Sequence, residues 1–337
     1  MVSEMEYDLA ISIGVASEKI IVNGPYKPAP ALEKFLIRGS MVNLDSYAEV
    51  ETFKAILNKY PDKNFKIGLR CNFELGNTSK SRFGFDIEDD KFYSMIDSLR
   101  EYKNMQLGNL HCHFPSREVH LFGDRVDRML KLYRRVQKNN EIKSIDIGGG
   151  LGGKLHEFVR KQLNYNVSEY QDYADIIANK FKQEFAKEKF KPILFLEPGT
   201  SLVADTMKFV SCVFEIKKIR GDYFAMTSGT KINFQPMASN FNMPIEIYGD
   251  EKKERQYFNK IDITGYTCME NDFLFKNYVG KLSIGDFVIL NNVGSYSIVF
   301  KPPFILPNVP IISLQKGKVN IIKEAELKEQ IFQTYKY

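Results

Sequence analysis

The chain has 337 residues, of which 44% are hydrophobic, and this is enough for about two domains whose cores need no disulfide or metal. Its 47 basic and 42 acidic side chains leave a formal charge of +5, spread along the chain, which does not indicate a nucleic-acid-binding surface. The four cysteines form no C-x-x-C pair, so we expect neither a disulfide scaffold nor a clustered zinc site. An acidic start and the lack of a run of about 18 apolar residues argue against a signal peptide and a membrane span. We therefore expect a soluble, cytoplasmic protein.

The first predicted element is a helix between Ser3 and Gly14. Ser3 and Glu6 have the S-x-x-E spacing of a capping box, and the glycine is a typical helix end. The apolar face of this helix carries Met5, Leu9 and Ile13. A strand normally precedes the first helix of an alternating β/α chain, so the first unit looks incomplete.

Up to residue 204, short β-branched runs alternate with amphipathic segments. The segment 124–139, for example, has apolar residues at helical spacing, namely Val126, Met129, Leu130, Tyr133 and Val136. Such alternation predicts a parallel sheet with helices outside it. We assign residues 1–204 to this α/β domain. Its six predicted strands are 20–22, 41–44, 66–70, 107–110, 144–147 and 193–196.

Residues 205–337 have a different pattern, in which strand-like runs are separated by turns and one helix is predicted around 324–332. The strand-like runs are 209–219, 223–227, 261–267 and 287–299. This predicts a separate, mostly antiparallel β domain.

Two motifs directly follow predicted strands of the first domain. Gly148–Gly150 comes after Ile145–Ile147 and lets backbone amides approach an anion closely, although the same residues could form only a tight turn. The run lacks the spacing of a P-loop or a dinucleotide-binding turn. Glu197 ends another strand before Pro198-Gly199, and its carboxylate either contacts a ligand or caps the turn.

His111 and His113 end the strand 107–110. By strand alternation they lie on the same face, at the rim where parallel-sheet proteins bind ligands. They could bind a metal, contact another ligand or be satisfied core histidines. Because only two other histidines remain, a multi-histidine metal centre is hard to assemble, and we expect no metal. In the second domain, G-Y-T-C-M-E-N-D (265–272) and G-S-Y (294–296) stand out, although an isolated cysteine is usually a small buried hydrophobe.

Taken together and in order, these motifs resemble those of the pyridoxal-phosphate decarboxylases of the ornithine/diaminopimelate type. The matching runs are H-x-H-x-x-S (111–116), D-I-G-G-G (146–150), E-P-G (197–199), G-x-x-C-x-x-x-D (265–272), G-S-Y (294–296) and S-R-F-G (81–84), the last resembling the family's S-K-F-G. The resemblance covers nearly the whole chain. It implies an alanine-racemase-like (β/α) TIM-like barrel, here with about six of its eight strands, and a C-terminal β-barrel or sandwich domain.

The resemblance also implies a cofactor, pyridoxal 5'-phosphate, and a site. His113 would stack on the ring and Glu197 would pair with the pyridine nitrogen, so that the ring accepts the electrons released by decarboxylation. Cys268 would donate a proton to the reacting carbon in the partner subunit's site, so that a homodimer with shared active sites is implied. His113 and Cys268 are thus the predicted catalytic residues, and Asp272 and Tyr296 would contact the substrate. The other predicted cofactor contacts are Ser116, Gly148, Gly149, Gly150, Gly199, Thr200 and Tyr296. Tyr296 would thus contact both the cofactor and the substrate.

Three departures from the resemblance matter. Thr200 stands where the family commonly has arginine. Met269 stands where an acid that grips the distal amine of the substrate usually follows the cysteine, and Glu270 comes one place later. The family's Schiff-base lysine would lie upstream of Val2–Gly14, and Lys27 does not match its motif. We therefore expect a misassigned start or a companion chain that supplies this segment.

The sequence thus predicts pyridoxal-phosphate-dependent decarboxylation of an amino acid, free or carrier-bound. The alternative is a non-catalytic binding or regulatory homologue. Thr200 and the unmatched lysine favour it, and the retention of Cys268 and Asp272 opposes it. A third hypothesis is a metal hydrolase that uses His111 and His113. The sequence specifies neither the amino acid nor its stereochemistry.

Overall fold

A computed structural model describes residues 1–76, 80–137, 141–152, 156–163, 168–234 and 241–336. Contacts within the chain separate two compact units. One consists of Met1–Gly152 with Val167–Pro198, and the other of Gly153–Asn166 with Gly199–Tyr337. The second unit thus includes the short segment Gly153–Asn166 as well as the chain from Gly199 onward. Among the described residues, no helix combines the length and the apolar character needed to cross a lipid bilayer.

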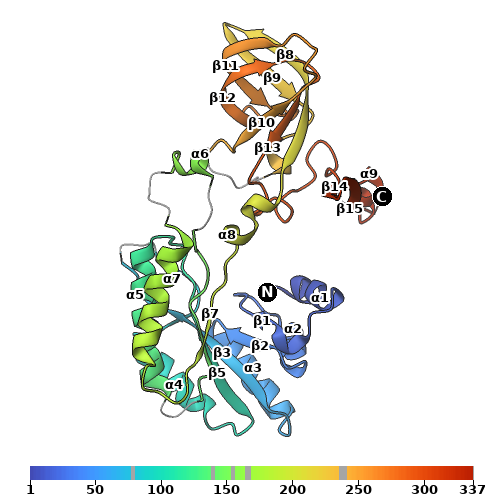
Figure 1. Cartoon of the computed structure of the whole chain (residues 1–337). Coiled ribbons are helices and arrows are strands. Elements are labelled where there is room, and N and C mark those ends of the chain that lie inside the picture. The colour runs from blue at the N-terminus through green and yellow to red at the C-terminus, as the bar shows by residue number, and fades with distance from the viewer. Residues whose placement is uncertain (77–79, 138–140, 153–155, 164–167, 235–240, 337) are drawn as a thin grey trace. The chain divides into compact units, whose positions relative to one another are not determined.

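The first unit is built on a parallel sheet (Figure 1). Its main path runs β1-β2-β3-β5-β6-β7, and every neighbouring pair on it is parallel. All six predicted strands are present, and an additional short strand, β4, pairs with β3. Because the path is open, the sheet forms a half-barrel. The strands are β1 (Ile21–Val22), β2 (Met41–Leu44), β3 (Phe65–Asn72), β4 (Phe85–Asp86), β5 (Met105–His111), β6 (Ser144–Asp146) and β7 (Ile193–Phe195).

Helices alternate with these strands along the chain, as predicted. All five apolar residues that define the predicted face of 124–139 are buried in α5, which lies beside α7 (Figure 1). The helices of this unit are α1 (Glu4–Ser12), α2 (Ala29–Ile37), α3 (Tyr47–Lys59), α4 (Asp90–Leu99), α5 (Val119–Val136) and α7 (Tyr170–Glu184), and a 3-10 turn covers Ser17–Lys19.

The helix α1 begins where the capping signal predicts, because the Ser3 side chain accepts the N–H of Glu6 at 3.2 Å. Its buried face, however, is not the apolar face predicted from the sequence. Tyr7 packs against Phe35 with ring centroids 4.6 Å apart, and its hydroxyl is 3.0 Å from the Ser40 hydroxyl. This aromatic anchor turns the predicted apolar residues outward, and the exposed side chains are Met5, Leu9 and Ile13.

The second unit contains a six-stranded sheet and a separate hairpin of β14 and β15. The sheet order is β10-β13-β8-β9-β11-β12, and its pairs are antiparallel except β9 and β11, which are parallel. The separate, mostly antiparallel β domain is confirmed, with one parallel pair, β9 and β11. Its strands are β8 (Phe209–Ile219), β9 (Asp222–Thr227), β10 (Ile245–Tyr248), β11 (Gln256–Thr264), β12 (Phe273–Leu282), β13 (Phe287–Leu290), β14 (Ile311–Gln315) and β15 (Lys318–Lys323).

The predicted long strand 287–299 was wrong in its extent. Only β13 forms, because Asn292 and Tyr296 adopt positive φ angles of 60° and 62° and turn the chain out of the sheet. The tail helix is confirmed in part as α9. The helical segments of this unit are α6 (Glu157–Arg160), α8 (Thr200–Val203), α9 (Lys328–Phe332) and the 3-10 turns Ala204–Thr206 and Lys231–Asn233.

Candidate active site

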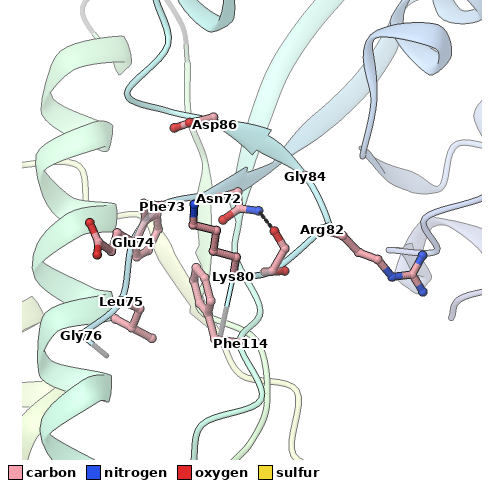
Figure 2. A pocket seen from close by; sticks show the side chains of 11 residues that line it. Asn72, Phe73, Glu74, Leu75, Gly76, Lys80, Arg82, Gly84, Asp86 and Phe114 are labelled. Carbon is pink, nitrogen blue, oxygen red and sulfur yellow. Dashed lines mark hydrogen bonds between the residues drawn. The ribbon is translucent and has the colours of Figure 1, made fainter. Parts of the chain in front are cut away.

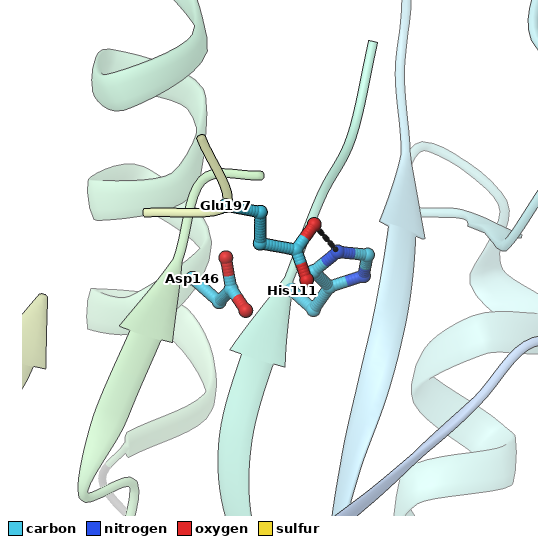
Figure 3. A group of neighbouring side chains, drawn as sticks. All are labelled: His111, Asp146 and Glu197. Atoms are coloured by element: carbon cyan, nitrogen blue, oxygen red, sulfur yellow. Dashed lines mark hydrogen bonds and ion pairs between the residues drawn. The ribbon is translucent and has the colours of Figure 1, made fainter. Parts of the chain in front are cut away.

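Three polar side chains converge at the carboxyl edge of the sheet in the first unit (Figure 3). His111 ends β5, Asp146 ends β6 and Glu197 follows β7. One donor or acceptor atom from each lies within 4.8 Å of the others. Because the carboxyl ends of parallel strands meet at one edge, residues distant in the sequence form one cluster.

Both histidines of the H-x-H motif approach the same oxygen of Glu197, as strand alternation predicts. Nε2 of His111 is 3.4 Å from Oε2 of Glu197, and Nδ1 of His113 is 3.5 Å from it. His111 is buried, whereas the His113 side chain is 38% exposed and its Nδ1 also lies 3.0 Å from the N–H of Gly149. Cys112, between them, points into the apolar core. His113 is therefore the imidazole that a ligand can reach.

The cluster holds its charge unevenly. Burial disfavours the charged form of Glu197, but its contacts with His111 and His113 outweigh burial and hold the pKa of Glu197 well below its usual range. Burial and the nearby Glu197 charge raise the pKa of Asp146 to about 7. Burial also lowers the pKa of His111. Near neutral pH the cluster therefore contains an ionised Glu197, a neutral His111 and a carboxyl group of Asp146 that still binds a proton.

Two atoms of this cluster, Nδ1 of His111 and Oδ2 of Asp146, are buried without a hydrogen-bond partner among the described residues. Buried polar atoms without partners are rare in native folds and call for a functional explanation. The perturbed pKa values of the same cluster are also typical of a functional site. The carboxyl edge of this sheet is thus the first candidate for a ligand site.

A chain of hydrogen bonds between side-chain amides holds Glu197 in place. Asn23, just after β1, donates to Oε1 of Glu197 and accepts from Asn43 of β2. Nδ2 of Asn109 in β5 donates to Oδ1 of Asn43 at 2.9 Å, and the Ser144 hydroxyl donates to Asn109 at 2.7 Å. All of these side chains are buried, so the chain fixes the position of the Glu197 carboxylate.

This amide chain crosses β3 only because β3 has a glycine at the crossing point. Gly68 pairs in register with Asn43 on one side and with Asn109 on the other. A Cβ atom on Gly68 would lie 1.8 Å from Oδ1 of Asn43. The missing side chain therefore leaves room for the two asparagines to meet.

The glycine turn 148–150 packs against the two other segments of the site. Gly148 and Gly150 have φ angles of 72° and 87°, which favour glycine. Cβ atoms would lie 2.3 Å from the Glu197 carbonyl oxygen at Gly149 and 2.8 Å from the Ser116 carbonyl oxygen at Gly150. The turn thus brings Ser116 and Gly148–Gly150 together with His113 and Glu197.

A cavity of about 720 Å³ lies next to this edge, and Phe114 and residues 72–76 form part of its lining (Figure 2). Ser81, Arg82 and Gly84 of the S-R-F-G run also line the cavity. Nδ2 of Asn72 holds this run by donating to the carbonyl oxygens of Ser81 and Phe83 at 2.8 and 2.7 Å. Arg82 points away from the other lining side chains (Figure 2).

The remaining predicted site residues belong to the second unit. Gly199 precedes α8, and the Thr200 hydroxyl is 3.0 Å from the hydroxyl of Ser295. This contact brings Thr200 close to the G-S-Y turn that carries Tyr296, whose side chain is exposed.

Cys268 and Asp272 lie in one turn between β11 and β12. Cys268 is exposed and Asp272 is buried. Oδ1 of Asp272 accepts from the Thr230 hydroxyl and from the N–H of Lys231, and Oδ2 accepts from the N–H and hydroxyl of Thr267. Asp272 therefore stabilises the turn that presents Cys268.

Lys27 lies in the loop after β1 rather than on a strand. It is buried and forms an ion pair with Glu49, with Nζ 2.9 Å from Oε2. Nζ also donates to the carbonyl oxygen of Gly24. The charge and hydrogen-bond donors of Lys27 are thus engaged by Glu49 and Gly24 within the first unit.

Comparison with known proteins identifies the family. Residues 1–204 match the model of the pyridoxal-binding domain of pyridoxal-dependent decarboxylases. The chain belongs to the pyridoxal-dependent decarboxylase family. Diaminopimelate decarboxylase of Aquifex aeolicus is 26% identical over 346 residues, which cover 97% of this chain and 77% of that protein. A Staphylococcus aureus decarboxylase of 2-[(L-alanin-3-ylcarbamoyl)methyl]-2-hydroxybutanedioate is 26% identical over 82% of this chain and 72% of its own length.

Solved structures share the fold of this decarboxylase-family chain. Diaminopimelate decarboxylase of Methanocaldococcus jannaschii superimposes with a TM-score of 0.84 at 22% identity, over 99% of this chain and 78% of that one. The arginine decarboxylase of Paramecium bursaria Chlorella virus gives a TM-score of 0.72 at 19% identity, over 90% and 79% of the two chains.

The residues at the carboxyl edge fit pyridoxal phosphate, the cofactor of this family. An ionised carboxylate suits a protonated pyridine nitrogen, an accessible imidazole suits an aromatic ring, and a glycine turn suits a phosphate. Sequence reasoning missed the amide chain of Asn23, Asn43 and Asn109 and gave no role to Asp146. A signal was present, because Asn43 and Asn109 interrupt otherwise apolar strands.

Proposed function

We propose that this chain binds pyridoxal phosphate at the carboxyl edge of its parallel sheet and takes part in the decarboxylation of a diaminopimelate-like amino acid. The observation that carries the proposal is Glu197, which is held ionised and fixed by His111 and Asn23 beside an accessible imidazole and a glycine turn. The bound cofactor would supply an electron-accepting ring. The protein would supply its orientation and the charge at its nitrogen.

Each predicted cofactor contact has a part in this proposal. Glu197 holds the proton on the pyridine nitrogen, and His113, fixed by the N–H of Gly149, lies against the ring. Ser116 and Gly148–Gly150 bind the phosphate. Contact of Gly199, Thr200 and Tyr296 with the cofactor, and of Tyr296 with the substrate, stays a prediction.

Cys268 is the proposed proton donor, because it is the exposed thiol of the turn that Asp272 stabilises. Substrate contact by Asp272 stays a prediction, and its hydrogen bonds to Thr230 and Thr267 support a positioning role for the turn. Glu270 is exposed in the same turn, whereas Met269 is half-buried. We therefore assign Glu270, rather than the residue next to Cys268, to the distal amine of the substrate.

We further propose a homodimer with shared sites, in which Cys268 serves the partner subunit. We also place the protein in the cytoplasm. All four cysteines are free thiols, which is typical of a reducing compartment.

The direct test is carbon dioxide release from a panel of amino acids in the presence of pyridoxal phosphate. The panel is meso-diaminopimelate, L-ornithine, L-arginine and L-lysine. We expect the highest kcat/KM for diaminopimelate, because the relatives from Aquifex aeolicus and Methanocaldococcus jannaschii are diaminopimelate decarboxylases. Binding of pyridoxal phosphate without release from any of them would instead favour the non-catalytic homologue.

His111, Asp146 and Glu197 also have donor atoms close enough together for a metal ion. This is the specific observation that favours the metal-dependent alternative, although with a different ligand set from the His111 and His113 pair of the metal-hydrolase hypothesis. Metal analysis of the purified protein decides between them. A stoichiometric ion that is displaced when Glu197 is replaced would contradict our assignment of Glu197 to the pyridine nitrogen.

A further inference from the structure

Arg125 is a buried cation directly behind the site. It lies on the inner face of α5 and is 0% exposed. Nη1 donates to the carbonyl oxygens of Ile147 and Gly149, both at 2.9 Å, and Nη2 donates to those of Phe114 and Ser116 at 3.3 and 3.5 Å. One side chain thus ties together the glycine turn and the H-x-H-x-x-S segment.

These hydrogen bonds set the direction of the peptide groups. A trans peptide points its N–H opposite to its C=O, and no cis peptide occurs in the described chain. When Arg125 holds the carbonyls of Gly149 and Ser116, the N–H groups of Gly150 and Arg117 point away from α5. Two donors from different turns are therefore fixed on the face opposite Arg125.

The charge of Arg125 has no acidic counterpart. Among the described residues, no carboxylate forms an ion pair with it; its polar partners are four carbonyl oxygens, and its guanidinium stacks 4.0 Å over the ring of Phe122. A guanidinium stays protonated even when buried, and buried charges in proteins are normally paired. The uncompensated charge beneath two aligned donors points to an anion above them.

We propose that Arg125 is a positioning residue for the phosphate of the cofactor, orienting both turns from behind and supplying a positive potential without touching the phosphate. This inference rests on the proposed pyridoxal-phosphate site. It assigns the selectivity for the phosphorylated cofactor to a residue outside the cofactor's contact shell.

The test compares Arg125→Met with the matched control Arg128→Met. Arg128 lies one turn away on α5, where it is exposed and paired with Glu88 at 2.7 Å, so its replacement removes the same charge without touching either turn. Equilibrium dialysis would measure the Kd of pyridoxal 5'-phosphate and of pyridoxal, which lacks the phosphate. The readout is the Kd of pyridoxal divided by the Kd of pyridoxal 5'-phosphate, and it needs no turnover.

We expect Arg125→Met to reduce this ratio by about tenfold or more, to weaken competition by inorganic phosphate, and to leave pyridoxal binding nearly unchanged. Arg128→Met should retain the wild-type ratio. An Arg125→Met protein that binds both ligands more weakly by the same factor would overturn the proposal, because it would show a merely structural role.

If Arg125→Met does not fold, Arg125→Lys replaces it, because lysine keeps the charge but cannot reach all four carbonyls. A wild-type ratio in Arg125→Lys would overturn the proposal, and a reduced ratio would support it. Failure of the proposed function is distinguishable, since the wild-type protein itself would then bind pyridoxal 5'-phosphate no better than pyridoxal.

Discussion

The two units hold the half-buried Glu197 and the buried Asp272 in different ways. Glu197 in the first unit keeps one oxygen on Asn23 and the other near two histidines, at an edge with unpartnered polar atoms and a shifted pKa. Both oxygens of Asp272 in the second unit are used by hydrogen bonds, Oδ1 with Thr230 and Lys231 and Oδ2 with Thr267 of its own turn. The first arrangement is built to receive a ligand, and the second to present neighbouring residues.

This difference separates binding from chemistry. The side chains that we assign to the cofactor are fixed by networks across several strands, which preorganises them. Those that we assign to the reaction, Cys268 and Glu270, are exposed on one turn. Substitutions in the first group should change cofactor affinity and stability, and substitutions in the second should change turnover while leaving both nearly intact.

The largest expected effect is on turnover, in Cys268→Ala. Loss of a positioned proton donor should slow carbon dioxide release by about 10²–10⁴-fold and should increase protonation at the cofactor carbon, which yields aldehyde instead of amine. The Kd of pyridoxal phosphate should not change. The control is Cys212→Ala, a half-buried thiol of β8. Near-normal turnover and clean amine from Cys268→Ala would contradict the assigned role.

A large loss of stability is expected from Gly68→Ala. The new Cβ would clash with Oδ1 of Asn43 and break the amide chain, so we expect a loss of about 2–4 kcal/mol in urea unfolding, with weaker cofactor binding. Gly108→Ala is the matched control in the same sheet, because its Cβ would meet Met41 at an ordinary 3.6 Å. Equal losses in the two variants would rule out the amide chain as the cause.

The charge balance of the cluster predicts a pH effect in Asp146→Asn. The pKa of Asp146 is raised from 3.8 to about 7, so between these values the unfolded chain has released the proton that the folded chain keeps. The Asp146 contribution therefore lowers stability as pH rises from about 4 to about 7. The free energy of unfolding of the variant should exceed that of the wild type by on the order of 1–3 kcal/mol between about pH 5 and pH 8.

Urea unfolding at several pH values measures this gain. The control is Asp124→Asn, which removes an exposed carboxylate of α5 and should give a flat difference. A flat difference in Asp146→Asn as well would contradict the uneven charge of the cluster.

The smallest expected effect concerns substrate selectivity. Glu270→Gln should raise the KM for diaminopimelate about two- to fivefold with little change in kcat, because an exposed charge contributes about 1 kcal/mol or less. Glu251→Gln, an exposed acid elsewhere in the second unit, serves as the control. An unchanged KM would remove Glu270 from the substrate site.

The sequence predicted the parallel sheet well because each of its strands is a short β-branched run between amphipathic helices. The sequence also indicated one shared edge for His113, Ser116, Gly148–Gly150 and Glu197, since each follows a strand. The direction of a strand side chain depends on register, so the amide chain through Gly68 could not be read from spacing.

Other differences have equally local causes. Tyr7 decides which face of α1 is buried, and a hydroxyl contact with Ser40 contributes to that choice. The parallel pairing of β9 with β11 joins segments separated by the strand β10, which alternation patterns do not encode. No role was assigned to Arg125 from the sequence, because its acceptors are backbone carbonyls from distant turns.

The most direct test of the central claim, that Glu197 binds the pyridine nitrogen of the cofactor, is ¹⁵N NMR of pyridoxal phosphate labelled at that nitrogen. With the wild-type protein we expect the chemical shift of a protonated nitrogen, since Glu197 is held ionised at the sheet edge. With Glu197→Gln the same nitrogen should be unprotonated. An unprotonated nitrogen bound to the wild-type protein, or a protonated one in the variant, would contradict the account.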